Sequence, residues 1–506
     1  MYHAFDATTL VEQFAFIPNS IFDKLNDLTD PNYSHQYTVN GGASVIDAFF
    51  SNDWHTVLVS GLGRGGQGLF ALDLTDPETD FVNETSGAGQ VLFEFTDSDD
   101  ADLGYTYGQP SIVRLQNGKW AAVIGNGYNN TEADGTPSTT GNAVIYLIDI
   151  ETGALISKFD TGVGTAQDPD QDPITGQRPN GMATPAVIDL NGDNIADAIY
   201  AGDLFGNVWK LDISGAQSTW KFAFDSGVAI NSTTQKTPLF TACAGNTCSA
   251  TNLQPITTQP QVVRHQTLPG FLVYFGTGQY FEVGDNTPAG QVTQSFYGIW
   301  DKAETTLSTL NRSNLLQQSI VAEHDLFGFE LRETSNNNID WTTHSGWYMA
   351  LINTEGGNTD NLGERQVSNS VVRNGRIIFT TLLPSNDPCT FGGSGWLMEL
   401  DLYSGARLEF TPFDLNGDGV FDEKDFLYVD ANNNGQFDPG ETVIGPASGK
   451  KSQVGIISTP SIVNSEDAEK EYKYTSGSSG AIEVTVENPG PNFSGRQSWR
   501  QLDFNN

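Results

Sequence analysis

The sequence predicts an all-β fold, a β-propeller, from three observations. A short segment that opens with a small residue or proline and continues with β-branched residues occurs six times. Each opener is followed by an apolar strand that usually ends in glycine, and then by an alternating strand that ends in aspartate. The 506 residues include 54 glycines and 22 prolines, which supply turns between short strands. A ring of four-stranded blades is built from such repeated short strands and turns.

The openers give the order of the blades, and proline is tolerated at the first position of a strand. They are residues 42–46, 109–113, 184–188, 259–263, 369–372 and 459–463. Residues 3–6 have the pattern of a third blade strand without an opener, so we expect the two ends of the chain to share a blade that closes the ring. We expect the propeller over residues 1–465 and the closing strands and a tail over 466–506. An open β-sandwich is the alternative.

The charge balance excludes one class of partner. Lys and Arg number 24 against 62 Asp and Glu, a net charge of −38, which repels phosphate backbones and disfavours nucleic acid binding. The hydrophobic fraction of 38% is enough for a sizeable core. No run approaches 18 apolar residues, so no membrane-spanning helix is expected. The first residues lack a signal-peptide pattern, and we expect that an upstream part is missing from this chain.

The three cysteines predict one local disulfide. Cys243 and Cys248 flank a Gly–Asn turn at a spacing that can close a small loop, and two unrelated thiols are the alternative. Cys389 is left without a predicted partner.

Two motif searches disfavour common enzyme classes. Residues 61–66 match G-x-G-x-x-G, but the next segment is a strand rather than a helix, so a hairpin is the better interpretation. The six histidines have no metal-binding spacing, and no G-x-S-x-G nucleophile elbow occurs.

A first calcium loop is predicted in the hairpin at residues 189–197. Asp189, Asn191, Asp193 and Asp197 place oxygen side chains at alternate positions, and Ile195 can add its backbone carbonyl. A cation of Ca²⁺ size takes six to eight such oxygens. An Asx-rich turn without metal is the alternative.

Two further loops in tandem, within an insertion at residues 411–445, follow EF-hand spacing. The candidate ligands of the first loop are Asp414, Asn416, Asp418, Val420 through its carbonyl, Asp422 and Asp425. Those of the second loop are Asp430, Asn432, Asn434, Gln436, Asp438 and Glu441. Residues 426–429 between the loops are too few for a helix–loop–helix pair. We therefore expect a compact insertion ordered by calcium and not an opening switch.

The chain also resembles the C-terminal β-propeller domain of the PilY/PilC family, which comprises pilus-tip adhesins and assembly factors of type IV pili. The matching motifs lie in order at residues 1–7, 16–18, 54–59, 71–75, 125–129, 189–203, 275–278, 379–385 and 495–500. The resemblance implies a propeller of the quinoprotein alcohol dehydrogenase type. We expect seven blades, six of them clear repeats, with a calcium-binding loop insertion.

The resemblance also implies a function. It implies an exported, non-enzymatic protein of the bacterial cell surface, at the pilus tip and associated with the outer membrane. Such a protein promotes pilus extension against retraction and supports twitching motility and attachment. Its implied partners are minor pilins, the pilus machinery and a host or abiotic surface, and its cofactor is Ca²⁺. Calcium control carries over to residues 189–197, where Asn191 replaces a commonly acidic residue. The von Willebrand A-like region usual in the family has no counterpart here.

Two other functions remain as alternatives. A calcium-dependent propeller that recognises carbohydrate or protein, like a lectin or an integrin, has hairpins of the same D-x-[DN]-x-D type. A pyrroloquinoline-quinone dehydrogenase is less consistent with the sequence, because that chemistry typically uses adjacent cysteines above the cofactor and no two cysteines are adjacent.

Overall fold

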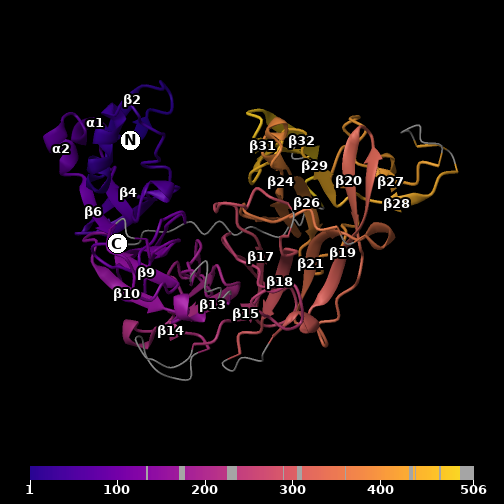
Figure 1. The fold of residues 1–506 in the computed structure, drawn as a ribbon, viewed down its shortest axis with the longest axis horizontal. Coiled ribbons are helices and arrows are strands. Elements are labelled where there is room, and N and C mark those ends of the chain that lie inside the picture. The colour runs from indigo at the N-terminus through magenta and orange to yellow at the C-terminus, as the bar shows by residue number, and fades with distance from the viewer. Residues whose placement is uncertain are drawn as a thin grey trace, which may run out of the picture. The chain divides into compact units, whose positions relative to one another are not determined.

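The computed structural model is a mostly-β structure (Figure 1). It describes residues 1–132, 135–169, 177–224, 236–288, 290–304, 310–358, 360–431, 437–438, 440–465 and 469–490. The chain folds into two compact units. Unit 1 comprises Met1–Gln317, Ile339–Leu351 and Asn361–Ser370, and unit 2 comprises Gln318–Asn338, Ile352–Asp360 and Val371–Asn506. Among the described helices, none is both long and apolar enough to cross a membrane.

Unit 1 is built from antiparallel sheets that have the up-and-down strand order of a propeller blade. The first sheet contains β3 (Ala43–Phe50), β4 (Asp53–Gly61), β5 (Gly68–Asp73) and β6 (Val91–Thr96). The second contains β7 (Ser111–Arg114), β8 (Trp120–Gly125), β9 (Val144–Asp149) and β10 (Leu155–Asp160). The third contains β11 (Ala186–Ile188), β12 (Ala198–Gly202), β13 (Asn207–Asp212), β14 (Lys221–Phe222) and β15 (Phe240–Thr241). The fourth contains β16 (Gln261–Arg264), β17 (Phe271–Gly276), β18 (Ser295–Asp301) and β21 (Gly346–Asn353).

The remaining elements of unit 1 are a hairpin and short helices. Strands β1 (Tyr2–Phe5) and β2 (Glu12–Phe16) pair with each other. The helices are η1 (Asn19–Thr29), η2 (Gly63–Gly65), α1 (Pro77–Asp80), α2 (Glu84–Ala88), η3 (Thr165–Gln167), η4 (Gln217–Thr219) and η5 (Arg312–Asn314).

The glutamine that precedes proline in two openers joins neighbouring sheets. The side chain of Gln109 donates to the carbonyl of Ala43 at 2.8 Å, and that of Gln259 donates to the carbonyl of Pro185 at 2.9 Å. In both cases the carbonyl lies in the opener of the preceding sheet. Proline has no amide hydrogen for the strand ladder, and the carboxamide beside it donates to the preceding sheet instead.

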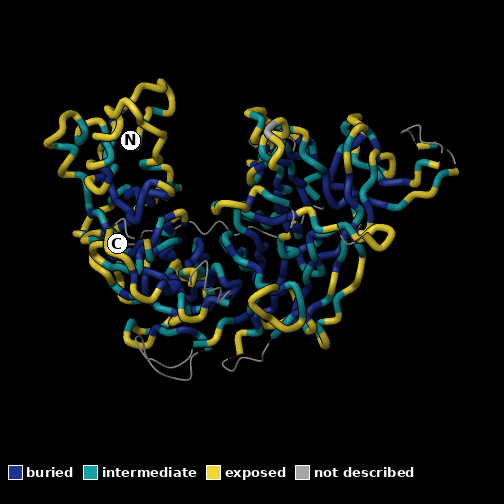
Figure 2. The backbone as a smooth tube through the Cα atoms, in the orientation of Figure 1, coloured by how far each residue is buried: buried dark blue, intermediate teal, exposed yellow. Residues whose placement is uncertain are grey.

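The core of unit 1 consists of apolar layers between adjacent sheets. Successive residues of a strand point to opposite faces, and β9 shows the consequence. Ile145 and Leu147 pack in the layer that also holds Trp209, whereas Val144 and Tyr146 pack in the layer on the other side. All of these side chains are essentially inaccessible to solvent. Figure 2 shows buried residues along the strands and exposed residues at the turns.

Unit 2 contains a larger sheet and a terminal three-stranded sheet. The larger sheet has the order β19 (Leu316–Leu326), β20 (Phe329–Thr334), β29 (Gly449–Lys451), β26 (Trp396–Asp401), β23 (Arg376–Thr380) and β22 (Val371–Arg373). The terminal sheet has β30 (Ser461–Asn464), β31 (Glu471–Ser476) and β32 (Ile482–Glu487). Two short pairs are β24 (Leu383–Pro384) with β25 (Gly393–Ser394) and β27 (Leu427–Tyr428) with β28 (Val443–Gly445). The short helices are η6 (Glu355–Gly357), η7 (Pro388–Thr390) and η8 (Glu423–Asp425).

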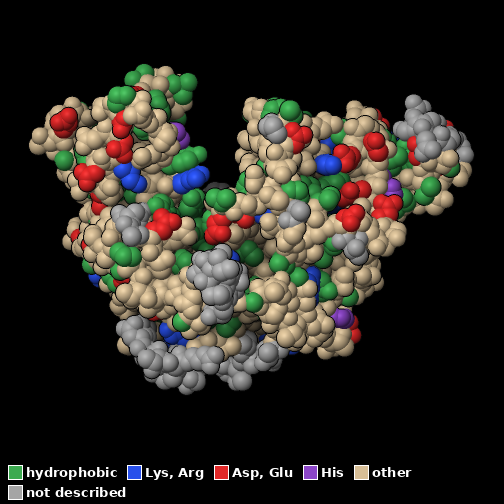
Figure 3. Space-filling view, viewed as in Figure 1, with side chains coloured by type: hydrophobic (Ala, Val, Ile, Leu, Met, Phe, Trp, Pro, Cys, Tyr) green, Lys and Arg blue, Asp and Glu red, His purple; other side chains and the backbone are tan. Residues whose placement is uncertain are grey.

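The openers are confirmed as first strands, because β3, β7, β11, β16, β22 and β30 begin within or directly beside them. The number of blades, the quinoprotein-type subclass and the domain boundaries at 411, 445 and 465 stay predictions. The expected sharing of one blade by the first and last strands joins the two units and also stays a prediction. Figure 3 shows acidic side chains spread over the face in view, in keeping with the net charge of −38.

Candidate metal centres

The first acidic loop, residues 189–197, is the hairpin turn between β11 and β12. Gly192 and Asn194 hold left-handed backbone conformations with φ of 85° and 65°. Glycine adopts such angles without cost, and asparagine is among the few other residues that tolerate them. The sequence therefore turns tightly here and brings its acidic side chains to one end of the hairpin.

Several side chains of this loop accept hydrogen bonds from backbone amides of the loop itself. Asp189 accepts from the amides of Gly192 at 2.6 Å and Asn194 at 2.7 Å. Asn191 accepts from the amide of Asp193 at 2.9 Å, and Asp193 accepts from the amide of Ile195 at 2.9 Å. The bonds of Asn191 and Asp193, each to the amide two residues on, are Asx turns, in which a side-chain oxygen replaces a backbone carbonyl.

Asp197 anchors the base of the loop. Its side chain is buried, 3% exposed, and Oδ2 accepts from the amide of Leu190 at 2.9 Å and from Nδ2 of Asn191 at 3.1 Å. The carbonyl of Leu190 in turn accepts a hydrogen bond from Arg264 of β16. The loop is thus fixed at its base and more open at its tip, where Asp193 is exposed.

The amides around Asp189 favour its ionised form. Burial alone would raise the pKa of Asp189, but the hydrogen bonds from Gly192, Asn194 and Asn191 outweigh burial and lower the pKa. A carboxylate that stays ionised is the form that binds a cation. Asp and Asn oxygens are the donor set that Ca²⁺ prefers, so the residues present are suited to this metal.

The described residues contain no group of three or more His, Cys, Asp or Glu side chains that could hold a metal ion. In the 189–197 loop, oxygens of Asp189, Asn191 and Asp193 accept hydrogen bonds from backbone amides. Calcium binding by Asp189, Asn191, Asp193, Ile195 and Asp197 therefore stays a prediction.

The first tandem loop has a similar set of Asx turns. Asn416 accepts from the amide of Asp418 at 2.8 Å, and Asp418 accepts from the amide of Val420 at 2.8 Å. Asp422 accepts from the amide of Lys424 at 2.8 Å and begins the short helix η8. Between the loops the chain forms only the two-residue strand β27, which agrees with the expected absence of an EF-hand helix pair there.

Asp425 and one oxygen of Asp414 are buried in this loop. Asp425 is 0% exposed, and it accepts from the amides of Leu415 at 2.9 Å and Asn416 at 3.1 Å. Burial, and further the negative charge of Asp414, raise the pKa of Asp425 despite these bonds. Oδ1 of Asp414 is buried and has no hydrogen-bond partner among the described residues. A buried carboxylate oxygen without a donor, beside a second buried carboxylate, favours a cation.

The second tandem loop is described only in part. Asn432, Asn434 and Gln436 lie outside the described residues. Glu441 accepts from the amides of Ala431 at 3.0 Å and Asp438 at 2.9 Å, which joins the two ends of the loop. Burial, and then the charges of Asp430, Glu441 and Asp438, raise the pKa of the adjacent Tyr428 hydroxyl. Calcium in both tandem loops stays a prediction.

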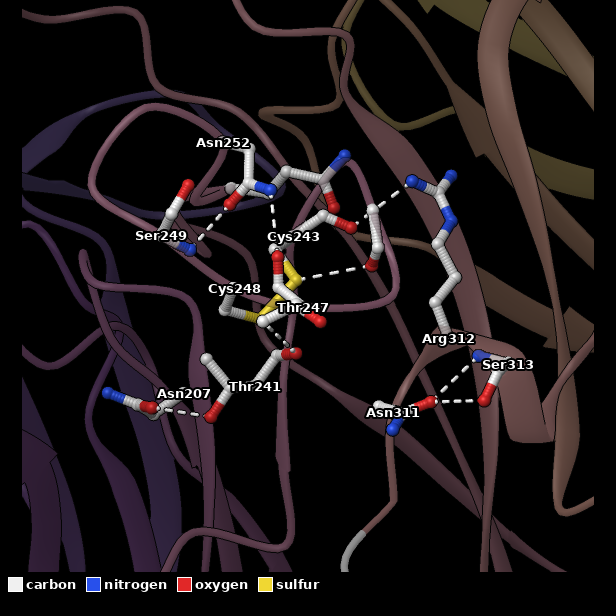
Figure 4. Close-up of a disulfide and its surroundings, with 12 residues drawn as sticks. Asn207, Thr241, Cys243, Thr247, Cys248, Ser249, Asn252, Asn311, Arg312 and Ser313 are labelled. Atoms are coloured by element: carbon white, nitrogen blue, oxygen red, sulfur yellow. Dashed lines mark hydrogen bonds between the residues drawn. A yellow bond between two sulfur atoms is a disulfide. The ribbon is translucent and has the colours of Figure 1, made fainter.

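The predicted disulfide between Cys243 and Cys248 is confirmed (Figure 4). The carbonyl of Cys243 accepts hydrogen bonds from Arg312 at 3.1 Å and from the hydroxyl of Tyr297 at 3.2 Å, so the bridge is tied to the fourth sheet. Cys389 is an exposed free thiol.

No sequence pattern predicted the polar cluster in the interior of unit 2. Glu399, Glu471, Glu487, Arg376 and Lys473 are 0% exposed and form ion pairs with one another. They come from four strands, and no spacing along the chain relates them. Only the alternation of charged and apolar residues in β31 and β32 could have marked one face of those strands as charged.

Comparisons with known proteins agree on one family. The family model of the PilY1 beta-propeller domain matches residues 1–329. The type IV pilus biogenesis factor PilY1 of Pseudomonas aeruginosa is 36% identical over 535 residues, which cover 100% of this chain and 41% of that protein. A PilY1 homolog of Xylella fastidiosa is 37% identical over 408 residues, covering 80% of this chain and 25% of that protein. The crystal structure of the P. aeruginosa PilY1 C-terminal domain superposes with a TM-score of 0.72 at 32% identity, covering 97% of this chain and 90% of that one.

The chain thus spans less than half the length of these curated relatives. The 36% identity over the whole chain, the family match and the shared fold all point to the same family. The chain belongs to the PilY1 β-propeller family.

Proposed function

We propose that this chain is the non-catalytic, calcium-binding propeller of a type IV pilus biogenesis factor. In this proposal it promotes pilus extension against retraction, and it supports twitching motility and surface attachment. The observation that carries the proposal is the 36% identity along the whole chain to a protein named as such a factor. The partners would be minor pilins and the rest of the pilus machinery.

The chemistry of the chain is consistent with an exported protein at the cell surface. Disulfides persist in oxidising compartments and are rare in the cytosol, and the chain carries the Cys243–Cys248 bridge. The acidic surface favours hydration and cation binding. We place the protein at the pilus tip, in association with the outer membrane.

The calcium part of the proposal rests on the loop at residues 189–197. Asp189 bonds two amides near the tip and Asp197 fixes the base, so both hold the turn without metal. The Asp193 side chain accepts from the amide of Ile195, its one hydrogen bond among the described residues, and it is exposed. A cation at this loop would hold the hairpin between β11 and β12 in a single shape, and pilus components would bind that shape.

The test is Asp193→Asn in the full-length protein. Asparagine keeps an oxygen that can accept from Ile195 but removes one charge from the predicted site, so the turn should persist while calcium affinity falls. Calorimetry of the purified protein should show a loss of one calcium equivalent. Asp23→Asn, which removes an exposed acid from η1, is the matched control.

In cells, the Asp193→Asn protein should be exported at the normal level while surface pili and twitching decrease. Deleting the retraction motor should restore pili, because the proposed role is to oppose retraction and not to catalyse assembly. Normal piliation combined with lost calcium would contradict the regulatory part of the proposal. Unchanged calcium stoichiometry would contradict the site itself.

A further inference from the structure

A hollow of about 200 Å³ lies in unit 1, away from the acidic loops. Loops of several blades form it: Arg178 precedes β11, Phe205 lies in the turn between β12 and β13, Gln279 and Asp285 follow β17, and Arg365 precedes β22. The volume is small for a drug-sized ligand, but it is enough for one sugar ring or an object of that size. No motif in the sequence marked these residues.

The polar lining of this hollow combines donors and acceptors. Gln279, Gln291 and Gln294 contribute carboxamides, each of which has both a donor and an acceptor group. Arg365 is 2% exposed and donates to the carbonyls of Gly363 at 2.9 Å and Gln279 at 3.0 Å. The third guanidinium nitrogen of Arg365, Nη2, and Oε1 of Gln294 are buried and have no hydrogen-bond partner among the described residues. A hydroxyl group can accept from one such group and donate to another.

The charges of the hollow are balanced, which disfavours an anionic ligand. Arg365 lies 3.8 Å from Asp285, and Arg178 lies 3.4 Å from the buried Asp168. Glu282 adds a further negative charge near Arg178. In a chain of net charge −38, no surplus positive charge remains here for a carboxylate or a sulfate. The lining is therefore suited to a neutral, hydroxyl-rich molecule.

An aromatic shelf, defined as Tyr107, Tyr128 and Phe281, belongs to the same region. The rings of Phe281 and Tyr128 stack at 4.6 Å, and Tyr107, which is 39% exposed, lies 6.1 Å from Phe281. Asp285 accepts from the amide of Phe281 at 2.9 Å, so one carboxylate lines the hollow and also fixes the loop that bears the shelf. Exposed aromatic faces pack against the C–H faces of sugar rings, which remain apolar between their hydroxyls.

We propose that this hollow and the aromatic shelf form a binding site for a neutral saccharide. One ring occupies the hollow with its hydroxyls on the carboxamides and Arg365, and the apolar face of the same or the next ring lies against Tyr107. The site contains none of the predicted calcium ligands. It goes beyond the pilus function proposed above and does not depend on it.

The test is saturation-transfer NMR on the whole chain in the presence of a chelator. The probes are methyl α-mannoside, methyl β-galactoside and N-acetylglucosamine, with glucuronic acid and N-acetylneuraminic acid as acidic counterparts. We expect transfer to at least one neutral probe and weaker transfer to the acidic ones. Loss of the signal in the chelator would overturn calcium independence, and no transfer to any neutral probe would overturn the site.

Two variants locate the binding. Tyr107→Ala and Gln291→Ala each remove one contact without disturbing a strand, and each should weaken the affinity for the bound probe roughly tenfold, the effect of one lost hydrogen bond or stacking contact. Tyr474→Ala in unit 2 is the matched control, because Tyr474 is 41% exposed and Tyr107 is 39% exposed. Circular dichroism and thermal unfolding establish that each variant is folded. Wild-type affinity in both site variants, or an acidic probe that binds more tightly than the neutral ones, would refute the proposal.

Discussion

The buried ion cluster of unit 2 gives the sharpest prediction of stability. Lys473 of β31 contacts Glu399 of β26 and Glu487 of β32, and Arg376 of β23 contacts Glu399 at 2.8 Å and Glu471 at 2.6 Å. All five side chains are 0% exposed. The cluster joins the terminal sheet to the larger sheet, as do the ion pairs of Lys450 with Glu483 at 2.8 Å and of Arg373 with Glu471 at 2.6 Å. We expect Lys473→Met, which keeps the length of the side chain and removes its charge, to loosen that junction.

The magnitude follows from the charges that would remain. Glu471 and Glu487 are paired directly across β31 and β32, and like charges in that arrangement repel. With Lys473 gone, three buried carboxylates face Arg376 and the partly exposed Arg373. Removing one partner of a buried ion pair costs about 3–5 kcal/mol. That is a large part of the roughly 5–15 kcal/mol that separates a folded domain from its unfolded chain.

Two measurements test this. Urea unfolding gives the loss of stability, and hydrogen–deuterium exchange of peptides from β31 and β32 shows whether the loss is located there. The matched control is Lys451→Met, also in unit 2, whose ammonium lies 2.6 Å from Glu330 with the side chains 29% and 53% exposed. A surface pair of that kind contributes less than about 1 kcal/mol. The double variant Lys473→Met with Glu487→Gln removes one charge of each sign and should recover part of the loss. Equal, small effects of the two lysine substitutions would refute the reasoning.

Three further outcomes can be checked on the same protein. Chelation should make residues 414–441 sensitive to protease while the sheets stay resistant, because this segment has few apolar side chains and its order would depend on bound metal. Equal cleavage with calcium and with chelator would contradict this. Replacing Cys243 and Cys248 together by alanine should destabilise unit 1 by about 2 kcal/mol in thermal unfolding, the chain-entropy value for so short a loop, whereas Cys389→Ser at the exposed thiol should be neutral. Burial lowers the pKa of His265, so NMR titration should place it below 6.5. Its neutral form contributes stability that is present above pH 6.5 and is lost as the pH falls toward the lowered pKa, because the unfolded chain then binds the proton more readily. A value at or above 6.5 would contradict the burial.

The strand order was predictable from the sequence because its signals are local. A small residue or proline followed by β-branched residues begins a first strand in the six openers, and aspartate with glycine marks turns. The Cys243–Cys248 bridge was predictable for the same reason, since five positions along the chain separate the two residues. Acidic spacing predicts which residues could bind calcium, but it does not predict their hydrogen-bond partners. Asp189 and Asp193 accept hydrogen bonds from backbone amides of the same loop.

The rest was not predictable because the contacts join distant positions. Arg376 and Glu471 are 95 positions apart in the sequence, and Arg365 is 86 positions from Gln279, to whose carbonyl it donates. Residue type alone would also predict that these side chains are exposed, because Lys and Glu are almost never fully buried unless they are paired. Neither the ion cluster nor the saccharide site has a sequence signature of its own.

The terminal sheet buries charged side chains and exposes apolar ones. Alternation in β31 and β32 predicts two faces, and the usual rule would bury the apolar one. Here Lys473 and Glu487 are buried, whereas Tyr474 and Val484 are 41% and 47% exposed. The inversion is tolerable because the opposite face of the junction supplies Arg376, so the buried charges are paired rather than left bare. An apolar core would stabilise this sheet through buried apolar surface, which does not depend on exact pairing. In an ion cluster each charge must lie beside its partner, so the cluster fixes the register of the last strands against the larger sheet.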